Sequence, residues 1–298
     1  MNNSIVLGAD IGGSHITVAL VDLQSRMVIE NSRVRVHVNS HGTAEEIITA
    51  WSQAMLRAVE NMPWSNNIGI AMPNPVDYET GISHIKGIDK YDALYGLNIK
   101  ELLASRLNLE PIQIRMKNDA GCFLQGETFG GAAKGFDSAI GLTIGTGIGT
   151  ARCHNNTAED ADLWHSPFKE SMVEDYISSR WFVKRYAELS GKTVENVKEL
   201  ASRHATDKHA QAVFTEFSGN LAAFLTSFVK SDNPEVIVVG GNIAHASALF
   251  FSNIEVLLHK QGIDVPIRKA LLGEDAAIIG AASCWYDAKR SSLNTMIL

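Results

Sequence analysis

The chain has 298 residues, of which 45% are hydrophobic and 20% are charged. This length and composition exclude a disordered or low-complexity chain and predict a folded, water-soluble protein of about two domains. The net charge is −7, from 26 basic and 33 acidic residues, and no basic cluster stands out, which argues against nucleic-acid binding. An anionic ligand would therefore need backbone groups to hold it, and the placement of the 24 glycines bears on that question.

Cysteine content and the N-terminal residues bear on location. The three cysteines stand far apart and form neither a disulfide framework nor a Cys-x-x-Cys signature, which favours a reducing cytoplasm. Residues 1–5 show no basic segment followed by an apolar one, and no apolar run approaches the ~18 residues that a membrane span needs. We therefore expect a soluble, cytoplasmic protein without a membrane partner.

The first part of the chain predicts strands, a glycine turn and one helix. Residues 4–9 are rich in strand-forming residues, and after the turn at residues 10–14 the apolar residues Ile16, Val18 and Leu20 alternate with a period of two. Thr43 and Glu46 make the capping box that begins the helix. Pro73 and Pro75 predict a rigid loop, because proline cannot donate a backbone hydrogen bond. In chain order we expect strands over 4–9, 16–20 and 27–38, a helix over 43–61 and a strand over 67–72.

The middle of the chain repeats the opening pattern. A strand over 138–144, a glycine turn over 145–147 and a strand over 148–153 follow the first such unit by about 135 residues, which suggests an internal duplication. A third glycine site, Gly240-Gly241, follows a buried strand over 235–239 and precedes a helix. The predicted helices of this part cover 120–129, 171–189, 208–230, the segment up to 261, and 275–288.

The glycine turns favour the binding of phosphate. A dinucleotide-binding fingerprint should end a strand and open a helix, whereas Gly12-Gly13-Ser14 opens a strand, so that interpretation fails. A glycine turn between strands can still aim several backbone N–H groups at one anion, and Ser14 and Thr146 could add hydroxyl donors. Asp10 beside a phosphate implies an intervening Mg²⁺, often through water. The alternative is two tight hairpins without a ligand.

An ordered set of motifs covering nearly the whole chain resembles the ROK family of bacterial sugar kinases and sugar-responsive repressors. The motifs are Asp10-Ile-Gly-Gly-Ser14, Asn118-Asp119-Ala, Leu142-Thr-Ile-Gly-Thr-Gly-Ile-Gly149 and Val238-Val-Gly-Gly-Asn242. The resemblance implies an α/β, two-lobed actin-like ATPase (ribonuclease H-like) fold, with mixed sheets and a cleft between the lobes. It also implies that Gly12, Gly13, Ser14, Gly145, Thr146 and Gly147 hold the ATP phosphates, and that Gly240 and Gly241 lie near the nucleoside.

The same resemblance makes Asp119 the catalytic base, because transfer to a sugar hydroxyl needs a group that accepts its proton. Asn118 offers one acceptor and two donors to a sugar hydroxyl. The competing interpretation is that either residue is the N-cap of the helix that follows. The two roles are compatible.

Further sugar ligands follow from the resemblance. Asp162 and His165 match a family element in which both end residues contact the sugar, although Asp replaces Glu and Trp164 replaces Gly. Glu174 matches a sugar-binding glutamate, but Ser171 and Glu174 also form a capping box. Asn74 stands where the family has glycine, in a loop near the sugar, and is either a substrate contact or a turn residue.

The chain departs from the family at its zinc motif. Residues 166–173 contain no cysteine, and His165 has no partner at metal-ligand spacing, so we expect no metal site there. Packing through Trp164, Phe168 and Trp181 would then hold this segment.

Together these observations predict an ATP- and Mg²⁺-dependent hexose kinase, with glucose phosphorylated at O6 as the favoured reaction. N-acetylmannosamine, N-acetylglucosamine or fructose are alternative substrates, and a sugar-binding sensor without catalysis is the alternative function. A DNA-binding role is not expected, because the first strand begins by Ser4 and no basic recognition helix is present. The predicted lobes are 1–117, with a C-terminal helix 286–298 packing back on it, and 118–285. The family resemblance also implies a homodimer.

Overall fold

The computed structural model describes residues 4–87 and 90–295, with side chains up to residue 286. The chain divides into two compact units. The first unit runs from the N-terminus to Gly131 and resumes at Glu274, and the second spans Ala132–Gly273. The boundary predicted after residue 117 differs from this division, because helix α3, which follows that residue, packs against the C-terminal helix α9 of the first unit.

The first unit is built on a mixed sheet with the strand order β3-β2-β1-β5-β8, with β4 pairing β2. Strand β1 is antiparallel to β2, whereas β1, β5 and β8 run parallel. The third predicted strand, 27–38, is interrupted by a 3-10 turn at Glu30–Ser32. The strands are β1 (Ile5–Ile11), β2 (His15–Asp22), β3 (Met27–Val28), β4 (Val34–His37), β5 (Ile68–Met72) and β8 (Ile114–Asn118), with a small hairpin of β6 (Val76–Asp77) and β7 (Ile82–Ser83).

Helix α1 (Ala44–Ala58) confirms the predicted helix and its capping box. Thr43 Oγ1 accepts a hydrogen bond from the Glu46 N–H, and the Glu46 carboxylate accepts one from the Thr43 N–H. The buried face of α1 carries Ile47, Trp51 and Met55 into a core shared with β1, β2 and β5. The other helical segments of this unit are η2 (Asp92–Leu94), α2 (Ile99–Leu107), η3 (Pro111–Gln113), α3 (Asp119–Gly130) and α9 (Asp275–Thr295).

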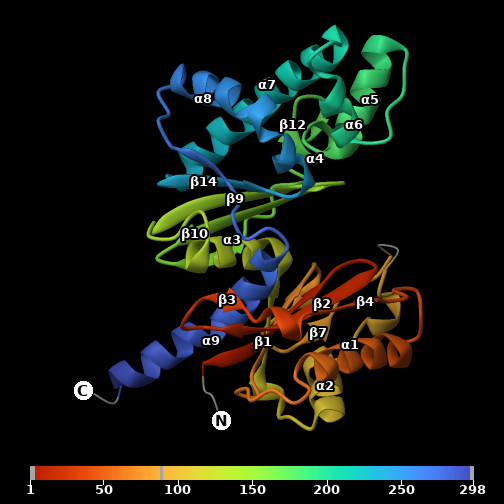
Figure 1. Ribbon diagram of the computed structural model, residues 1–298, viewed down its shortest axis with the longest axis vertical. Helices are drawn as coiled ribbons and strands as arrows, with labels where there is room; N and C mark the ends of the chain where they lie inside the picture. The colour runs from red at the N-terminus through yellow and green to blue at the C-terminus, as the bar shows by residue number, and fades with distance from the viewer. Residues whose placement is uncertain (1–3, 88–89, 296–298) are drawn as a thin grey trace. The chain divides into compact units, whose positions relative to one another are not determined.

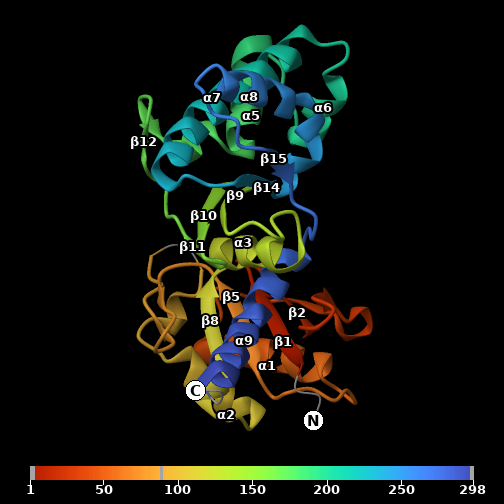
Figure 2. The same ribbon diagram turned by 90° about the vertical axis from the view of Figure 1, so that its left-hand side faces the viewer.

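Helix α9 lies against β1 and α3, although these elements are far apart in sequence (Figures 1 and 2). Glycines allow this approach. A Cβ atom on Gly126 would overlap the Ala276 carbonyl oxygen, and one on Gly280 would overlap that of Cys122. The two helices therefore meet backbone to backbone. The predicted C-terminal helix 286–298 belongs to α9 as far as Thr295, and residues 296–298 lie outside the described residues.

The second unit has the strand order β11-β10-β9-β14-β15. Strands β9 and β10 are antiparallel around a glycine turn, and β9 is parallel to β14. This repeats the arrangement of β1, β2 and β5, which is consistent with the suggested duplication. The strands are β9 (Ser138–Ile144), β10 (Ile148–His154), β11 (Thr157–Asp160), β14 (Val236–Gly240) and β15 (Ile267–Lys269), with a hairpin of β12 (Pro167–Phe168) and β13 (Ser171–Met172).

Helices form the remainder of the second unit and bury a core rich in phenylalanine. The predicted helix 171–189 is split into α4 and α5, because the Ser179 N–H donates to the Gly145 carbonyl oxygen at the glycine turn (2.7 Å). The helices are α4 (Val173–Tyr176), α5 (Ser179–Ser190), α6 (Val197–Arg203), α7 (Lys208–Asp232), η4 (Asn242–Leu249) and α8 (Phe251–His259).

One helix among the described residues, Lys208–Asp232, is long and apolar enough to cross a membrane by length and composition. It is the central core helix of the second unit, and 61% of its apolar window is buried there. Such a buried helix is weak evidence for a membrane span.

Candidate functional site

The first glycine turn joins β1 to β2. The Gly12 N–H donates to the His15 carbonyl oxygen (2.9 Å), and Gly12, Gly13 and Ser14 are exposed. The hydroxyl of Tyr91 donates to the Gly12 carbonyl oxygen (2.6 Å), and burial raises the pKa of Tyr91 to about 12, so this donor stays protonated. The turn is thereby held at a backbone carbonyl while its residues stay exposed. Sequence reasoning missed Tyr91.

His15 contacts the serine of this turn. Its Nδ1 lies 2.9 Å from Ser14 Oγ, and its ring packs edge-on against His37 on the paired strand β4. His15 therefore orients the Ser14 hydroxyl, a contact that the sequence did not indicate.

Two carboxylates lie at the ends of strands in the same sheet. Asp10 is near the end of β1, and Asp119 follows β8 as the first residue of α3. Burial, with the neighbouring charge of Asp119, raises the pKa of Asp10 to about 7, against the opposing effect of Arg35. Burial also raises the pKa of Asp119, which the Ala120 N–H and Lys90 oppose. Asp10 and Asp119 thus belong to strand ends of one sheet, with β5 between their strands, and the charge of Asp119 acts on Asp10.

Asn118 is the N-cap of α3, as the alternative interpretation predicted. Its Oδ1 accepts a hydrogen bond from the Gly121 N–H (3.1 Å), and the residue is 7% exposed. The cap places Asp119 in the first turn of the helix. A contact from the Asn118 amide to a sugar stays a prediction.

The second glycine turn joins β9 to β10 and holds Glu174. The Gly145 N–H donates to the Gly147 carbonyl oxygen (2.9 Å). The Glu174 carboxylate accepts a hydrogen bond from the Ile148 N–H (3.1 Å) and pairs with Arg180 (2.5 Å). A Cβ atom on Gly147 would overlap Glu174 Oε2, so this glycine is needed for the contact.

The capping box proposed for Ser171 and Glu174 does not form. Helix α4 begins after Met172, which makes no side-chain cap, and Ser171 Oγ donates to Asp175 instead. Glu174 is drawn away from the helix end by the Ile148 N–H and Arg180. The Ile148 N–H comes from a strand 26 residues away, whereas Arg180 lies six residues along the chain in α5 and was missed by sequence reasoning.

The residues that follow the third glycine site line a cavity of about 850 Å³ within the second unit, whereas Gly240 and Gly241 are not part of its lining. Gly240 ends β14, and Gly241 follows with φ +79°, where a Cβ atom would lie 2.5 Å from the Ile144 carbonyl oxygen. The cavity is as large as a typical small-molecule site, roughly 300–1,000 Å³. It is lined by Gly145, Thr146, Ser179, Asn196, Val197, Lys198, Ala201, Asn242, Ile243, His245 and Ala246. Helix α6, which contributes to this lining together with its N-cap Asn196, has no counterpart among the sequence predictions.

Asp162 and His165 are neighbours in an exposed loop of the second unit. Asp162 Oδ1 accepts a hydrogen bond from Trp164 Nε1 (3.0 Å) and lies 3.7 Å from His165 Nδ1. Trp164 also packs against the His165 ring. Trp164 therefore braces both predicted sugar ligands.

The following hairpin is held by aromatic and cationic contacts. Phe168 packs against Tyr176, and the Lys169 ammonium lies 5.0 Å from the Tyr176 ring. Trp181 is buried against Phe182. No group of three or more His, Cys, Asp or Glu side chains that could hold a metal ion occurs within residues 4–87 and 90–286.

Asn74 lies in the first unit, in the exposed loop that follows β5. The Tyr78 hydroxyl lies 2.8 Å from Asn74 Oδ1 and 2.8 Å from the Met72 carbonyl oxygen. This tyrosine fixes the direction of the Asn74 amide. Whether the amide touches a substrate stays a prediction.

The chain is similar to curated sugar kinases over most of its length. The chain is 25% identical to an N-acetyl-D-glucosamine kinase of Mannheimia succiniciproducens, over 94% of this chain and 98% of that one. It is 24% identical to a glucokinase of Thermotoga maritima, over 93% of this chain and 96% of that one.

Among solved structures, the chain is similar to a ROK family glucokinase from Streptomyces griseus in complex with glucose and AMPPNP. The TM-score is 0.74 at 22% identity, over 94% of this chain and 98% of that one. This likeness confirms the α/β, actin-like fold with mixed sheets. A family model described as "ROK family" matches residues 6–160 and 167–288, and the chain therefore belongs to the ROK family.

Proposed function

We propose that this protein transfers the γ-phosphoryl group of ATP to a hexose hydroxyl, with Asp119 as the base. The observation that carries the proposal is Asp119 itself, a partly buried carboxylate with a raised pKa at the first turn of α3. A carboxylate with a raised pKa is a stronger base, and burial keeps competing water away from it. Curated relatives named as sugar kinases support the same reaction class.

The cavity beside Gly241 is the proposed site of the nucleoside. Its lining includes Gly145 and Thr146, so backbone N–H groups of the second glycine turn stand beside it. Glycine at these positions lets a phosphate approach the backbone, and such dipoles can hold an anion despite the net charge of −7.

The first glycine turn, with Gly12, Gly13 and Ser14, offers the same kind of exposed backbone donors. Asp10 fits a hydrated Mg²⁺, because cation binding would relieve the cost of its ionised form beside Asp119. When bound, the ion would neutralise charge on the transferred phosphoryl group. Asp10 would orient it, and Tyr91 and His15 would keep the turn in place.

Glucose, phosphorylated at O6, is the favoured substrate, and N-acetylglucosamine is its main competitor because relatives carry both names. Asn118, Asp162, His165, Glu174 and Asn74 are the proposed sugar contacts. A homodimer and a cytoplasmic location also stay predictions.

The test is coupled ATP turnover against a panel of hexoses, for wild type, Asp119→Asn and the control Asp264→Asn. Asp264 is 79% exposed and belongs to a loop of the second unit. We expect hexose-dependent turnover in wild type and the control, and a loss of at least about 10³-fold in kcat for Asp119→Asn with nucleotide binding retained. Sugar binding without turnover in wild type would overturn the kinase assignment. Full activity in Asp119→Asn would overturn only the role of Asp119.

A further inference from the structure

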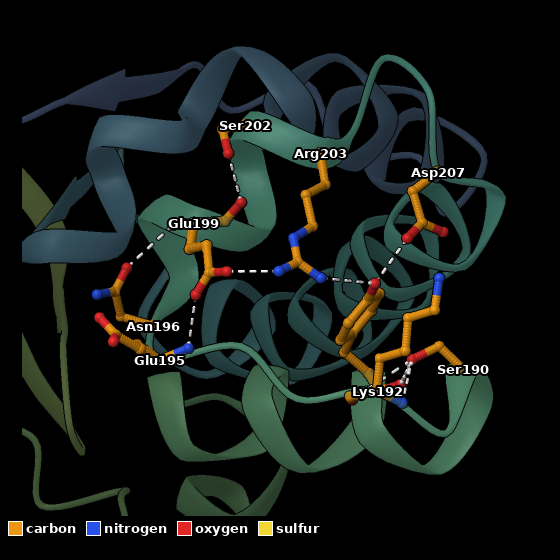
Figure 3. A network of polar contacts seen from close by, with 9 residues as sticks. Ser190, Lys192, Glu195, Asn196, Glu199, Ser202, Arg203 and Asp207 are labelled. Atoms are coloured by element: carbon orange, nitrogen blue, oxygen red, sulfur yellow. Dashed lines mark hydrogen bonds and ion pairs between the residues drawn. The ribbon is translucent and has the colours of Figure 1, made fainter.

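A second polar cavity lies in the second unit, away from the residues of the candidate site. It has a volume of about 480 Å³ and lies among the end of α5, the loop that follows it, the end of α6 and the start of α7 (Figure 3). Its lining is polar: Lys192, Arg203 and Lys208 are cationic, Asp207 is anionic, and Tyr186 and Thr206 carry hydroxyl groups.

The back wall of this cavity is a fixed hydrogen-bond network. Tyr186 is fully buried, and its hydroxyl donates to Asp207 Oδ2 (2.6 Å) and accepts from Arg203 Nη1 (3.2 Å). Arg203 Nη2 in turn donates to Glu199 Oε1 (2.5 Å). Asp207 Oδ1 caps α7 by accepting from the His209 N–H (2.8 Å). Figure 3 shows Arg203 extended between Glu199 and this wall.

These contacts occupy both acidic groups near the cavity. Asp207 is committed to the Tyr186 hydroxyl and the helix cap, and the hydroxyl bond lowers the pKa of Asp207. Glu199 is paired with Arg203. Among the residues that the structure describes, the ammonium groups of Lys192 and Lys208 form no ion pair. Among the lining residues the cationic side chains Lys192, Arg203 and Lys208 outnumber the carboxylate of Asp207, so the cavity carries a net positive charge in a protein whose net charge is −7.

We propose that this cavity binds a small phosphorylated anion. Lysine is a frequent phosphate ligand because it acts as a compact point charge, and Lys192 and Lys208 could both pair with the oxygens of one phosphate group. The Thr206 side chain also lines the cavity and can donate a hydroxyl hydrogen bond. The volume exceeds what an inorganic phosphate fills and lies in the range of small-molecule sites, which favours a phosphate monoester of sugar size.

Helix α6 connects this anion cavity to the proposed nucleotide cavity. Its residues Val197, Lys198 and Ala201 line the larger cavity, and Arg203, at its end, lines the anion cavity. An anion that draws on Arg203 would weaken the hydrogen bond from Arg203 to the Tyr186 hydroxyl, which joins α6 to α5, and would thereby shift the position of α6. Because coupling between two sites is reciprocal, the anion would change nucleotide affinity and the nucleotide would change anion affinity. This second step rests on the proposed function.

The first experiment is calorimetric titration of the full chain with inorganic phosphate and with a phosphorylated hexose. The variant Lys192→Gln/Lys208→Gln is compared with the control Lys134→Gln/Lys260→Gln, which removes the same charge from exposed positions outside both cavities. We expect binding to weaken at least tenfold in the cavity variant, and to stay within twofold in the control and in Asp119→Asn. Equal weakening in both lysine variants would overturn the site, as would loss of binding in Asp119→Asn.

The two probes identify the source of the phosphate. Tighter binding of the phosphorylated hexose supports a phosphate monoester, whereas equal binding of both probes assigns the site to free phosphate and overturns the size argument. Coupling is tested by measuring ADP affinity with and without saturating anion. A change of at least threefold in wild type that is absent in the cavity variant supports it, and an unchanged affinity overturns it. Anion binding is measured without turnover, so failure of the kinase assignment would leave its result readable.

Discussion

Glu174 offers a sharp test of how the second glycine turn is held. Replacement by Ala removes the acceptor of the Ile148 N–H and the partner of Arg180. Leaving a partly buried N–H without an acceptor costs about 1–3 kcal/mol. The Arg180 side chain is 61% exposed, so its ion pair adds no more than about 1 kcal/mol. We expect a loss of about 2 kcal/mol in the free energy of unfolding.

Thermal unfolding and two-substrate kinetics measure the two consequences. A loss of about 2 kcal/mol corresponds to a fall in Tm of about 4–8 °C for a protein of this size class. Because the carboxylate supports the Gly145–Gly147 turn, we expect the KM for ATP to rise as well as the KM for sugar. A purely sugar-binding glutamate would raise only the second.

Two further variants separate the contribution of the ion pair from that of the hydrogen bond to the Ile148 N–H. Glu188→Ala removes a carboxylate that is 45% exposed, against 22% for Glu174, and that pairs with Arg185 but contacts no glycine turn; it should cost less than about 1 kcal/mol. Arg180→Gln removes the ion pair and leaves the Ile148 bond. If Glu174→Ala matched Glu188→Ala in Tm and left the KM for ATP unchanged, the anchoring role would be refuted.

Two other predictions concern packing and pH. Gly126→Ala should abolish folding or lower the free energy of unfolding by more than about 3 kcal/mol, because its Cβ would collide with the Ala276 carbonyl. Gly219→Ala, which has open space around its Cβ, should instead raise the free energy of unfolding by about 1 kcal/mol. Chemical denaturation measures both changes. For Asp10, whose folded pKa of about 7 lies above the ordinary 3.8, ionisation is disfavoured by the fold. Its contribution to stability is therefore greatest below pH 4 and is lost as the pH rises to 7. Asp10→Asn should become more stable than wild type across that window, by about 1.4 kcal/mol per pH unit and up to about 4 kcal/mol, and the difference should be constant above about pH 7. Denaturation curves at about pH 5 and about pH 8 that show the same difference would contradict the burial of Asp10.

The sequence predicted those parts of the fold that depend on local pattern. Alternating apolar residues located β2, runs of strand-forming residues beside the glycine turns located β1, β9 and β10, and the Thr43–Glu46 capping box located the start of α1. The motifs indicated the ROK family because they follow one another in the order that this family has. Asn118 was correctly weighed as a helix cap, since that role needs only the residues that follow it.

Features that depend on distant residues were not predicted. Glu174 had the spacing of a capping box, but the Ile148 N–H and Arg180 compete for its carboxylate. The bond from Ser179 to the Gly145 carbonyl broke one predicted helix into two. Tyr91, which supports the first glycine turn, acts across 79 positions of sequence. Local sequence patterns do not indicate hydrogen bonds between residues that only the fold brings together.

The return of α9 to the first sheet has a consequence for biosynthesis. The second unit is one continuous stretch, Ala132–Gly273, whereas the first is closed only by residues that follow it. As the chain leaves the ribosome, β1, β5 and α3 must wait for α9, with Gly126 and the strand glycines uncovered. The second unit can fold meanwhile, since domains generally fold as units during synthesis. The unit that is synthesised first is thus completed last. Chaperones would be needed during the time between the synthesis of α3 and that of α9, while these surfaces are uncovered.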